Sequence, residues 1–196
     1  MVITRRSGII FLSVMSLLLC SFLVQAEDIK VQHPELERSS IVVLTQPSFK
    51  FTGNTQFSWV EKNHADISGA FKKSGLPVQT LLDEGIHQAI KDKGYRFSSE
   101  GKDSLLIQYH VSLESEMDDM ALAIHYGLAP GLNANSEASR KYERGTLVVD
   151  LIDPVLMKVV WRGAIGVFTG LEKTDEGRKN RVSKLLKELF ANLPAA

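Results

Sequence analysis

The stretch GTLVVDLIDPVLMKVVWRGAI, residues 145–165, decides the fold because it contains two alternating segments joined by a turn. Hydrophobic and polar residues alternate over 145–152 and again over 158–168, which is typical of strands that bury one face. Between them, Asp153 can accept hydrogen bonds from backbone N–H groups two residues further on, and Pro154 fixes the next φ angle. The stretch therefore predicts a β-hairpin.

The register of this hairpin follows from burial, because a slip of one residue would turn every core side chain to solvent. Two registers keep Trp161 on the core face. In the first, Leu151 faces Trp161 and Asp150 faces Arg162; in the second, Asp150 faces Val160 and Arg162 is its diagonal neighbour. Both registers predict a cross-strand ion pair on the polar face, which adds little stability there but specifies the register.

Further strands and helices are expected on both sides of the hairpin. Short β-rich runs predict strands at 41–45 and at 56–59, and strict alternation predicts another over 104–114. Apolar residues at helical spacing predict amphipathic helices that begin at Pro77 and at Asp175. This order indicates an α+β fold: a mainly antiparallel sheet with two amphipathic helices packed on one face and the other face largely polar.

Residues 116–140 have no single periodicity. A helical stripe runs from Met117 to Leu128, but residues 121–127 could also pair as a strand, and residues 127–139 are rich in loop formers. We expect an irregular conformation for this segment.

Residues 1–26 have the composition of a secretory signal peptide. Arg5 and Arg6 precede an apolar run, and the small residue Ala26 ends the segment. We expect cleavage after Ala26. The alternative is an uncleaved anchor, since about 17 apolar residues could just span a bilayer.

The chain then divides into a signal peptide at 1–26, a polar linker at 27–40 and a single α+β domain at 41–194. Cys20 is the only cysteine, and Leu19 stands where a lipoprotein signal has a small residue, so lipidation is disfavoured. We expect a periplasmic protein, with a membrane-anchored one as the alternative. Membrane association is expected only if the signal is retained or Cys20 is lipidated.

Charge and motifs narrow the possible functions. Basic and acidic residues both total 23, whereas a general nucleic-acid-binding protein needs a basic excess to neutralise phosphates. The sequence contains no Gly-x-Ser-x-Gly, His-Glu-x-x-His or phosphate-binding Gly-Lys-Ser/Thr motif. We therefore expect no nucleic-acid partner, no cofactor and no metal, and we favour a non-enzymatic role.

Three residues form the one candidate catalytic group. His110, Asp150 and Arg162 fall on the polar sides of strands that are expected to share a sheet. An aspartate could orient the imidazole, and the arginine could hold an anion. The competing interpretation is a hydrated open face with one ion pair.

Two weaker possibilities concern metal ions. Asp83 and His87 lie four residues apart on a predicted helix, and residues 114–119 form an acidic cluster. The first pair lacks the three or four ligands of a metal site, and the cluster lacks the spacing of a calcium loop. Solvated surfaces are the better interpretation of both.

Five segments together carry a resemblance to a known family. They occur in the order FSWV, IHQAIKDKGYR, DSLLIQYHVSL, YERGTLVVDLID and KVVWRGAI. Over about residues 41–194 the chain resembles the bacterial family known as domain of unknown function 4136. Many members have a Thr-Gly step in the hairpin turn, where this chain has Leu156 and Met157. The resemblance implies an α+β fold in a secreted or lipid-anchored protein of a Gram-negative envelope, and it implies no reaction.

The expected function is that of an exported, non-enzymatic binding or envelope-maintenance module. Its partner would be an unidentified envelope ligand or protein. One alternative is a hydrolase of an envelope substrate that uses His110, Asp150 and Arg162. Another is a structural partner of an outer-membrane assembly, with 117–128 as an exposed apolar contact. Ligand, oligomeric state and physiological role stay open.

Overall fold

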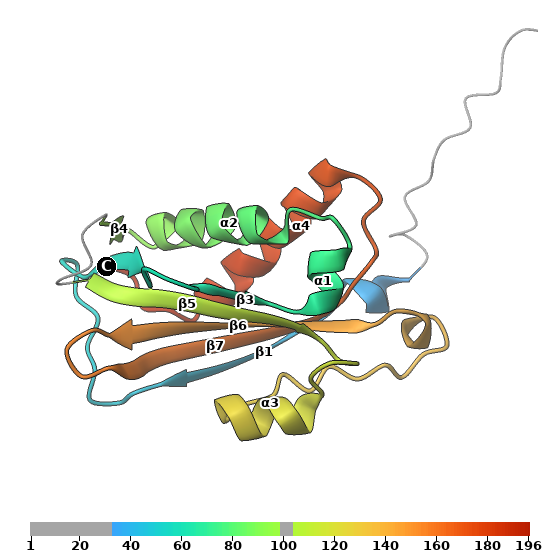
Figure 1. Cartoon of the computed structure of the whole chain (residues 1–196), viewed down its shortest axis with the longest axis horizontal. Coiled ribbons are helices and arrows are strands. Elements are labelled where there is room, and N and C mark those ends of the chain that lie inside the picture. Colours follow the sequence, from blue (N-terminus) through green and yellow to red (C-terminus); the bar gives the residue numbers. More distant parts are fainter. Residues whose placement is uncertain (1–32, 99–103) are drawn as a thin grey trace, which may run out of the picture.

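The structure, a computed structural model, describes residues 33–98 and 104–196. The expected signal peptide, with Cys20 and the cleavage site at Ala26, lies outside the described residues. Figure 1 shows one sheet with helices α2 and α4 on one side and helix α3 on the other.

Seven strands form one sheet, in the order β1-β7-β6-β5-β2-β4, with β3 paired to β5 beside β2. Their bounds are β1 Ser39–Thr45, β2 Gln56–Trp59, β3 Ala65–Ile67, β4 Arg96–Phe97, β5 Ser104–Leu113, β6 Arg144–Asp153 and β7 Lys158–Phe168.

The sheet is mixed, so the prediction of a mainly antiparallel sheet is wrong. Strands β1, β7, β6 and β5 pair antiparallel, but β2 and β3 both run parallel to β5, and β4 runs parallel to β2. The physical reason is a crossover. After β3 the chain passes through helices α1 and α2 before it re-enters the sheet at β4 and then β5, and such a connection returns the chain in the same direction.

The predicted hairpin is present in the first of the two registers. Asp150 pairs with Arg162 and Leu151 pairs with Trp161. The register then shifts after Leu151, so that Ile152 faces a residue one position closer to the turn than uniform alternation would give. A bulge of this kind increases the local twist at the end of the hairpin.

The turn confirms the predicted role of Asp153. Its Oδ1 accepts hydrogen bonds from the backbone N–H groups of Val155 and Leu156, at 2.8 and 2.9 Å. Met157 takes a left-handed conformation with φ of 50°, the conformation that glycine adopts most easily. The side chains of Val155, Leu156 and Met157 are all exposed.

Four α-helices and two short 3-10 helices lie within the described residues. They are η2 Pro34–Glu37, α1 Gly69–Lys73, α2 Val78–Asp92, α3 Asp119–Tyr126, η4 Ser139–Lys141 and α4 Asp175–Phe190. The two predicted amphipathic helices are confirmed as α2 and α4. Gly94 follows α2 with φ of 89°, and the Thr174 side chain caps α4 by accepting from the N–H of Gly177.

Helices α2 and α4 pack on the sheet and on each other. Trp161, fully buried on β7, stacks on Phe190 of α4 with ring centroids 5.5 Å apart, which confirms its predicted place in the core. The helices approach closely at Gly85, where a Cβ atom would lie 2.4 Å from Leu186 Cδ1. The main core therefore lies between this helical layer and the sheet.

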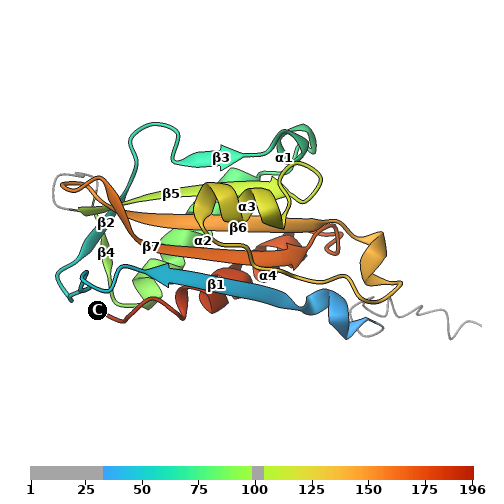
Figure 2. The same ribbon diagram turned by 90° about the horizontal axis from the view of Figure 1, so that it is seen from below.

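The opposite face is not open, so the prediction of a largely polar second face is wrong in part. Helix α3 lies across it (Figure 2), and Leu122 and Leu128 pack there against Val148 and Ala164 of β6 and β7. The segment 116–140 thus contains a helix in place of a wholly irregular conformation. The Asp118 side chain caps the start of α3, and its apolar stripe covers small and β-branched side chains of the sheet.

Part of the expected linker contributes to the fold. Leu36 of η2 is buried against Leu132 and Phe168, and β1 begins at Ser39. Within the two described ranges, no helix has both the length and the apolar character needed to cross a membrane.

Candidate functional site

The structure brings Asp150 and Arg162 together beneath α3. Two hydrogen bonds join them, from Arg162 Nε to Asp150 Oδ1 at 2.5 Å and from Nη2 to Oδ2 at 2.6 Å. Asp150 is 3% exposed. The carboxylate of Asp150 raises the pKa of the Arg162 guanidinium. The predicted ion pair is therefore confirmed, but it is bidentate and largely buried, and it does not lie on an open face.

Helix α3 completes this arrangement through Tyr126. The Tyr126 carbonyl oxygen accepts a hydrogen bond from Arg162 Nη1 at 2.7 Å, and Arg162 Cζ lies 5.2 Å from the tyrosine ring centroid. Burial raises the pKa of the Tyr126 hydroxyl, and the charges of Asp66 and Asp150 add to this rise. Because this largely buried guanidinium bonds both the sheet and α3, it holds the helix against the sheet.

His110 pairs with Asp66 and not with Asp150. On the sheet, His110 faces Val148 of β6 and Asp66 of β3, and its Nδ1 lies 2.9 Å from Asp66 Oδ2. Its ring lies 5.4 Å from the ring of Tyr126, and its Nε2 is buried without a hydrogen-bond partner. The three candidate residues are thus neighbours that belong to two separate pairs.

A polar cavity of about 200 Å³ lies beside these pairs. Its described lining consists of Asn63, Asp66, Gln108, Tyr109, His110, Tyr126, Val148 and Asp150. This lining contains no serine, threonine or cysteine, the usual oxygen and sulfur nucleophiles. Sequence patterns carry no signal for Asp66 or Tyr126, since the first lies in a three-residue strand and the second in the segment expected to be irregular.

A second polar group lies on the helical side of the sheet. Asp83 of α2 accepts a hydrogen bond from the Tyr109 hydroxyl at 2.8 Å, and His64 Nε2 lies 3.2 Å from both of its carboxylate oxygens. Burial, together with Asp83, raises the pKa of Tyr109. His87, the other member of the possible metal pair, packs edge-on against Phe97 instead. Asp83 and His87 therefore have different partners.

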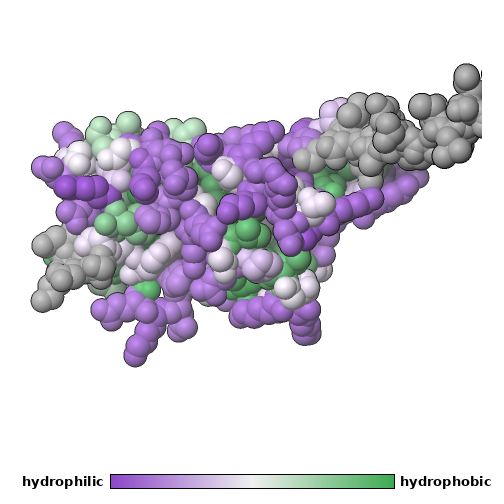
Figure 3. Space-filling view, turned by 90° about the horizontal axis from the view of Figure 1, so that it is seen from above, coloured by the Kyte–Doolittle hydropathy of each residue, from purple (hydrophilic) through white to green (hydrophobic). Residues whose placement is uncertain are grey.

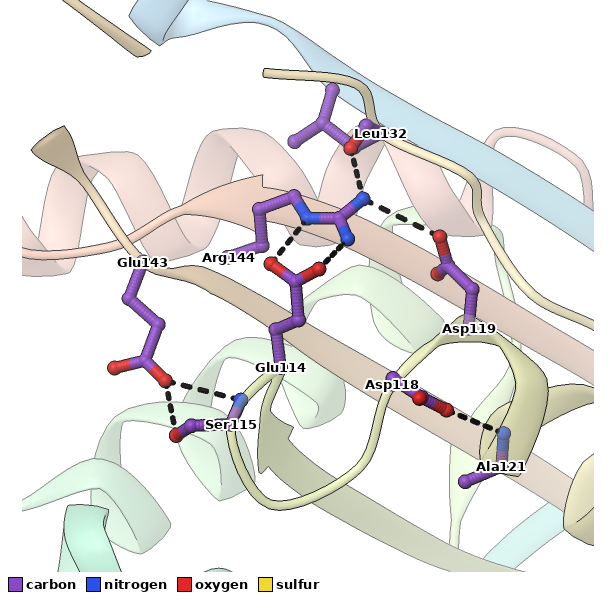
Figure 4. Close-up of polar contacts among 8 residues, drawn as sticks. All are labelled: Glu114, Ser115, Asp118, Asp119, Ala121, Leu132, Glu143 and Arg144. Atoms are coloured by element: carbon purple, nitrogen blue, oxygen red, sulfur yellow. Dashed lines mark hydrogen bonds and ion pairs between the residues drawn. The ribbon is translucent and has the colours of Figure 1, made fainter. Parts of the chain in front are cut away.

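Two of the acidic side chains at 114–119, Glu114 and Asp119, are bound by one arginine (Figure 4). Arg144 of β6 bonds both carboxylate oxygens of Glu114, lies 3.3 Å from Asp119 Oδ2 and donates to the Leu132 carbonyl. These contacts fix the start of α3 and the segment after it to the sheet. Across the described residues, no group of three or more His, Cys, Asp or Glu side chains could hold a metal ion.

An apolar concave site lies between α1, α2, α4 and the sheet. It has a volume of about 190 Å³. Figure 3 looks onto this side of the molecule and shows hydrophobic side chains recessed between hydrophilic ones. The apolar part of the lining includes Phe71, Leu76, Leu82, Val111, Leu147, Ile165, Val167, Val182, Leu185 and Leu186. Apart from Phe71 and Leu76, these residues lie on the apolar faces of predicted strands and helices, and the sequence does not reveal that they leave a space.

Three charged residues from the start of α4 and the loop before it also line this pocket: Glu172, Arg178 and Arg181. Arg181 is buried and bonds Glu172 Oε1 at 2.8 Å and the Phe168 carbonyl at 2.9 Å. Arg178 is 24% exposed and pairs with Asp175, which is 89% exposed. The Nε atom of Arg178 is buried and has no hydrogen-bond partner. The lining of the apolar pocket therefore includes one arginine with a buried donor that has no hydrogen-bond partner.

Comparison with solved structures identifies folds similar to this one. The dodecamer of a PelC point variant from Paraburkholderia phytofirmans matches with a TM-score of 0.50 and 9% identity, over 81% of this chain and 98% of that one. A second PelC dodecamer from the same organism has a TM-score of 0.49 and 9% identity, over 81% of this chain and 99% of that one. A PDZ domain protein from Parabacteroides distasonis has a TM-score of 0.45 and 14% identity, and the match covers 86% of this chain and 40% of that one. At these identities the first likeness shows the fold alone.

No curated protein matches the chain. A family model does match, over residues 42–195, which is nearly the range of the resemblance seen in the sequence. Its description is domain of unknown function, DUF4136, and the chain belongs to this family.

Proposed function

We propose that the protein is an exported, non-enzymatic binding module of the cell envelope, and that its ligand enters the apolar pocket between α1, α2, α4 and the sheet. The observation that carries this proposal is the pocket itself, about 190 Å³ in volume and lined mainly by hydrophobic side chains. An empty apolar cavity of about 150 Å³ stays dry and binds benzene-sized molecules. A pocket with a few polar groups at its edge is the usual form of a small-molecule site.

The polar cavity beneath α3 supports a structural role better than hydrolysis. Asp150 is engaged by Arg162, and His110 by Asp66, while acyl transfer would need a nucleophile within hydrogen-bond reach of a base. Turnover of an envelope substrate that is lost in His110→Ala would overturn this assignment.

Binding of a small apolar probe tests the proposal. We expect octanol to bind the purified domain in calorimetry and to raise its melting temperature, because a ligand that binds only the folded state stabilises it. Val167 lines the pocket from β7, and Val167→Phe should fill the space and abolish binding. Octanol binding that survives this change would show that the pocket is not the site.

The export signal supports a periplasmic location, with a membrane anchor as the alternative. N-terminal sequencing of the protein from fractionated cells tests this. We expect the chain to begin at Glu27. A lipid-modified Cys20, or an uncleaved N-terminus in the membrane fraction, would contradict the proposal.

A second candidate function is a structural role in an envelope assembly, because the outer side of α3 is apolar and exposed. Met120 is 68% exposed and Ile124 is 73% exposed, one helical turn apart. Leu122 and Leu128 of the same segment are buried within the monomer, so the contact would involve only the outer side of α3. Analytical ultracentrifugation of the wild type and of Met120→Glu/Ile124→Lys tests it. Cross-linking from position 124 is the second measurement. The role would be excluded if both proteins are monomeric and no envelope protein is cross-linked at that position.

A further inference from the structure

We infer that the ligand of the apolar pocket is a free linear amphiphile with an anionic head, such as a medium-chain carboxylate, and that Arg178 binds the head. This inference rests on the proposed function and names its ligand class. Arg178 determines this ligand class. It places a positive charge beside the apolar lining, and a ligand can replace its present partner, Asp175.

The charge balance of the lining favours an anion. Two arginines and one glutamate line the pocket. Glu172 neutralises the buried Arg181, and the other positive charge of the lining is that of Arg178, whose partner Asp175 lies outside the lining. A partly desolvated guanidinium attracts a carboxylate more strongly than a fully hydrated lysine does.

The present partners of Arg178 leave donors for a ligand. Its Nη1 donates to the Glu172 carbonyl at 3.0 Å and its Nη2 lies 2.5 Å from Asp175 Oδ1. The Asp175 pair is a surface ion pair three residues apart in the sequence, a kind that contributes little. A ligand carboxylate can therefore replace Asp175, and the buried, unpaired Nε adds a second donor for bidentate binding.

The shape of the lining favours a chain over a ring system with polar substituents. Leu82, Val111 and Leu186 come from three different elements and enclose the deeper part, and all are buried. Leu76, at the edge, is exposed. Because about 150 Å³ accommodates six carbon atoms of benzene, about 190 Å³ suits a chain of roughly six to eight carbons.

The test compares octanoate with octanol by calorimetry on the purified domain, in the wild type and in Arg178→Gln. We expect octanoate to bind about tenfold more tightly than octanol in the wild type, since a charge-assisted hydrogen bond is worth at least that factor. In Arg178→Gln the two affinities should become equal. Arg140→Gln, an exposed arginine on η4 away from the pocket, is the matched control and should keep the preference.

Chain length provides a second readout. From butanoate to octanoate the affinity should rise about fourfold for each CH₂ group, as expected for burial of a methylene. Beyond about eight carbons it should level off, because the pocket is full. Val167→Phe should abolish binding of every member. Leu185→Phe, from α4, is the second blocking variant in case the first unfolds.

The outcomes separate the inference from the proposed function. Equal binding of octanoate and octanol, abolished by Val167→Phe, overturns the anion preference and leaves the pocket as a binding site. No binding of either probe, or binding that both blocking variants retain, overturns both.

A final experiment distinguishes a free amphiphile from a membrane lipid with the same chemistry. Vesicles of phosphatidylcholine with about 30% phosphatidylglycerol, a probe composition chosen for its negative charge, are sedimented with the protein. Binding to vesicles without binding to octanoate overturns the inference, whereas octanoate binding without co-sedimentation supports it.

Discussion

Arg162 and Asp150 lie directly opposite each other on β7 and β6, joined by two hydrogen bonds of 2.5 and 2.6 Å. Helix α3 covers the pair, and the Tyr126 carbonyl takes a further donor of the guanidinium. The pair therefore connects the hairpin register to the docking of α3.

Removal of one partner should be costly. We expect Asp150→Ala to lower the free energy of unfolding by about 3–5 kcal/mol, because an unpaired guanidinium would stay largely buried. The double variant Asp150→Leu/Arg162→Met should lose much less. Urea unfolding measures both, and Lys141→Ala, which breaks an exposed pair with Glu137, should cost below about 0.5 kcal/mol. A loss in Asp150→Ala as small as in this control would show that the pair is not buried in solution.

Tyr109 should make the stability depend on alkaline pH. Its pKa is raised by burial and by Asp83, so above about pH 10 the unfolded state loses the phenolic proton while the folded state keeps it. The free energy of unfolding then falls as the pH rises above about 10, the pKa of tyrosine in the unfolded state. The fall is about 1.4 kcal/mol per pH unit. In Tyr109→Phe we expect a shallower slope between about pH 9 and 11. Equal slopes in the wild type and in Tyr109→Phe would contradict the conclusion that Tyr109 is buried and protonated in the folded state.

Arg144 should control the attachment of α3. In Arg144→Met the contacts to Glu114, Asp119 and the Leu132 carbonyl are lost. We expect backbone amides of α3 to exchange with solvent faster, while those of β6 and β7 keep their protection. Hydrogen exchange with mass spectrometry measures this, with Lys141→Met as the control. Uniform loss of protection would mean that α3 does not open as a separate unit.

Gly163 should not tolerate a side chain. A Cβ atom there would lie 2.4 Å from Trp161 Cη2 and 2.9 Å from Leu189 Cδ1. We expect Gly163→Ala to cost about 1–3 kcal/mol, the usual range for overpacking a core. Gly53→Ala, where the new atom meets only ordinary contacts, should change the unfolding midpoint little. Equal effects of the two changes would contradict the packing of the indole over Gly163.

The hairpin and the two long helices could be predicted because their signals are local. Alternation places Leu151 and Trp161 on one face, and the requirement to bury that face leaves two registers. Helical spacing identifies α2 and α4 directly. The glycine at position 163 is explained only by the structure, since no local pattern shows that an indole ring covers it.

The remaining features depend on contacts between distant segments. Strands β3 and β4 have three and two residues, too few for a periodic signal, so the sequence does not reveal the parallel crossover. Asp66 meets His110 across 44 positions of sequence, and only the sheet topology brings them together. A pocket is harder still to predict from the sequence, because it depends on how well neighbouring core side chains fill the space.

The most direct test of the central claim is an NMR measurement of the domain with methyl groups labelled, in the presence of octanol. We predict intermolecular NOEs from the alkyl chain to the methyl groups of Leu82, Val182 and Leu186, which line the pocket. NOEs confined to exposed apolar side chains such as Leu156 or Ile124, with none to the pocket, would contradict the account.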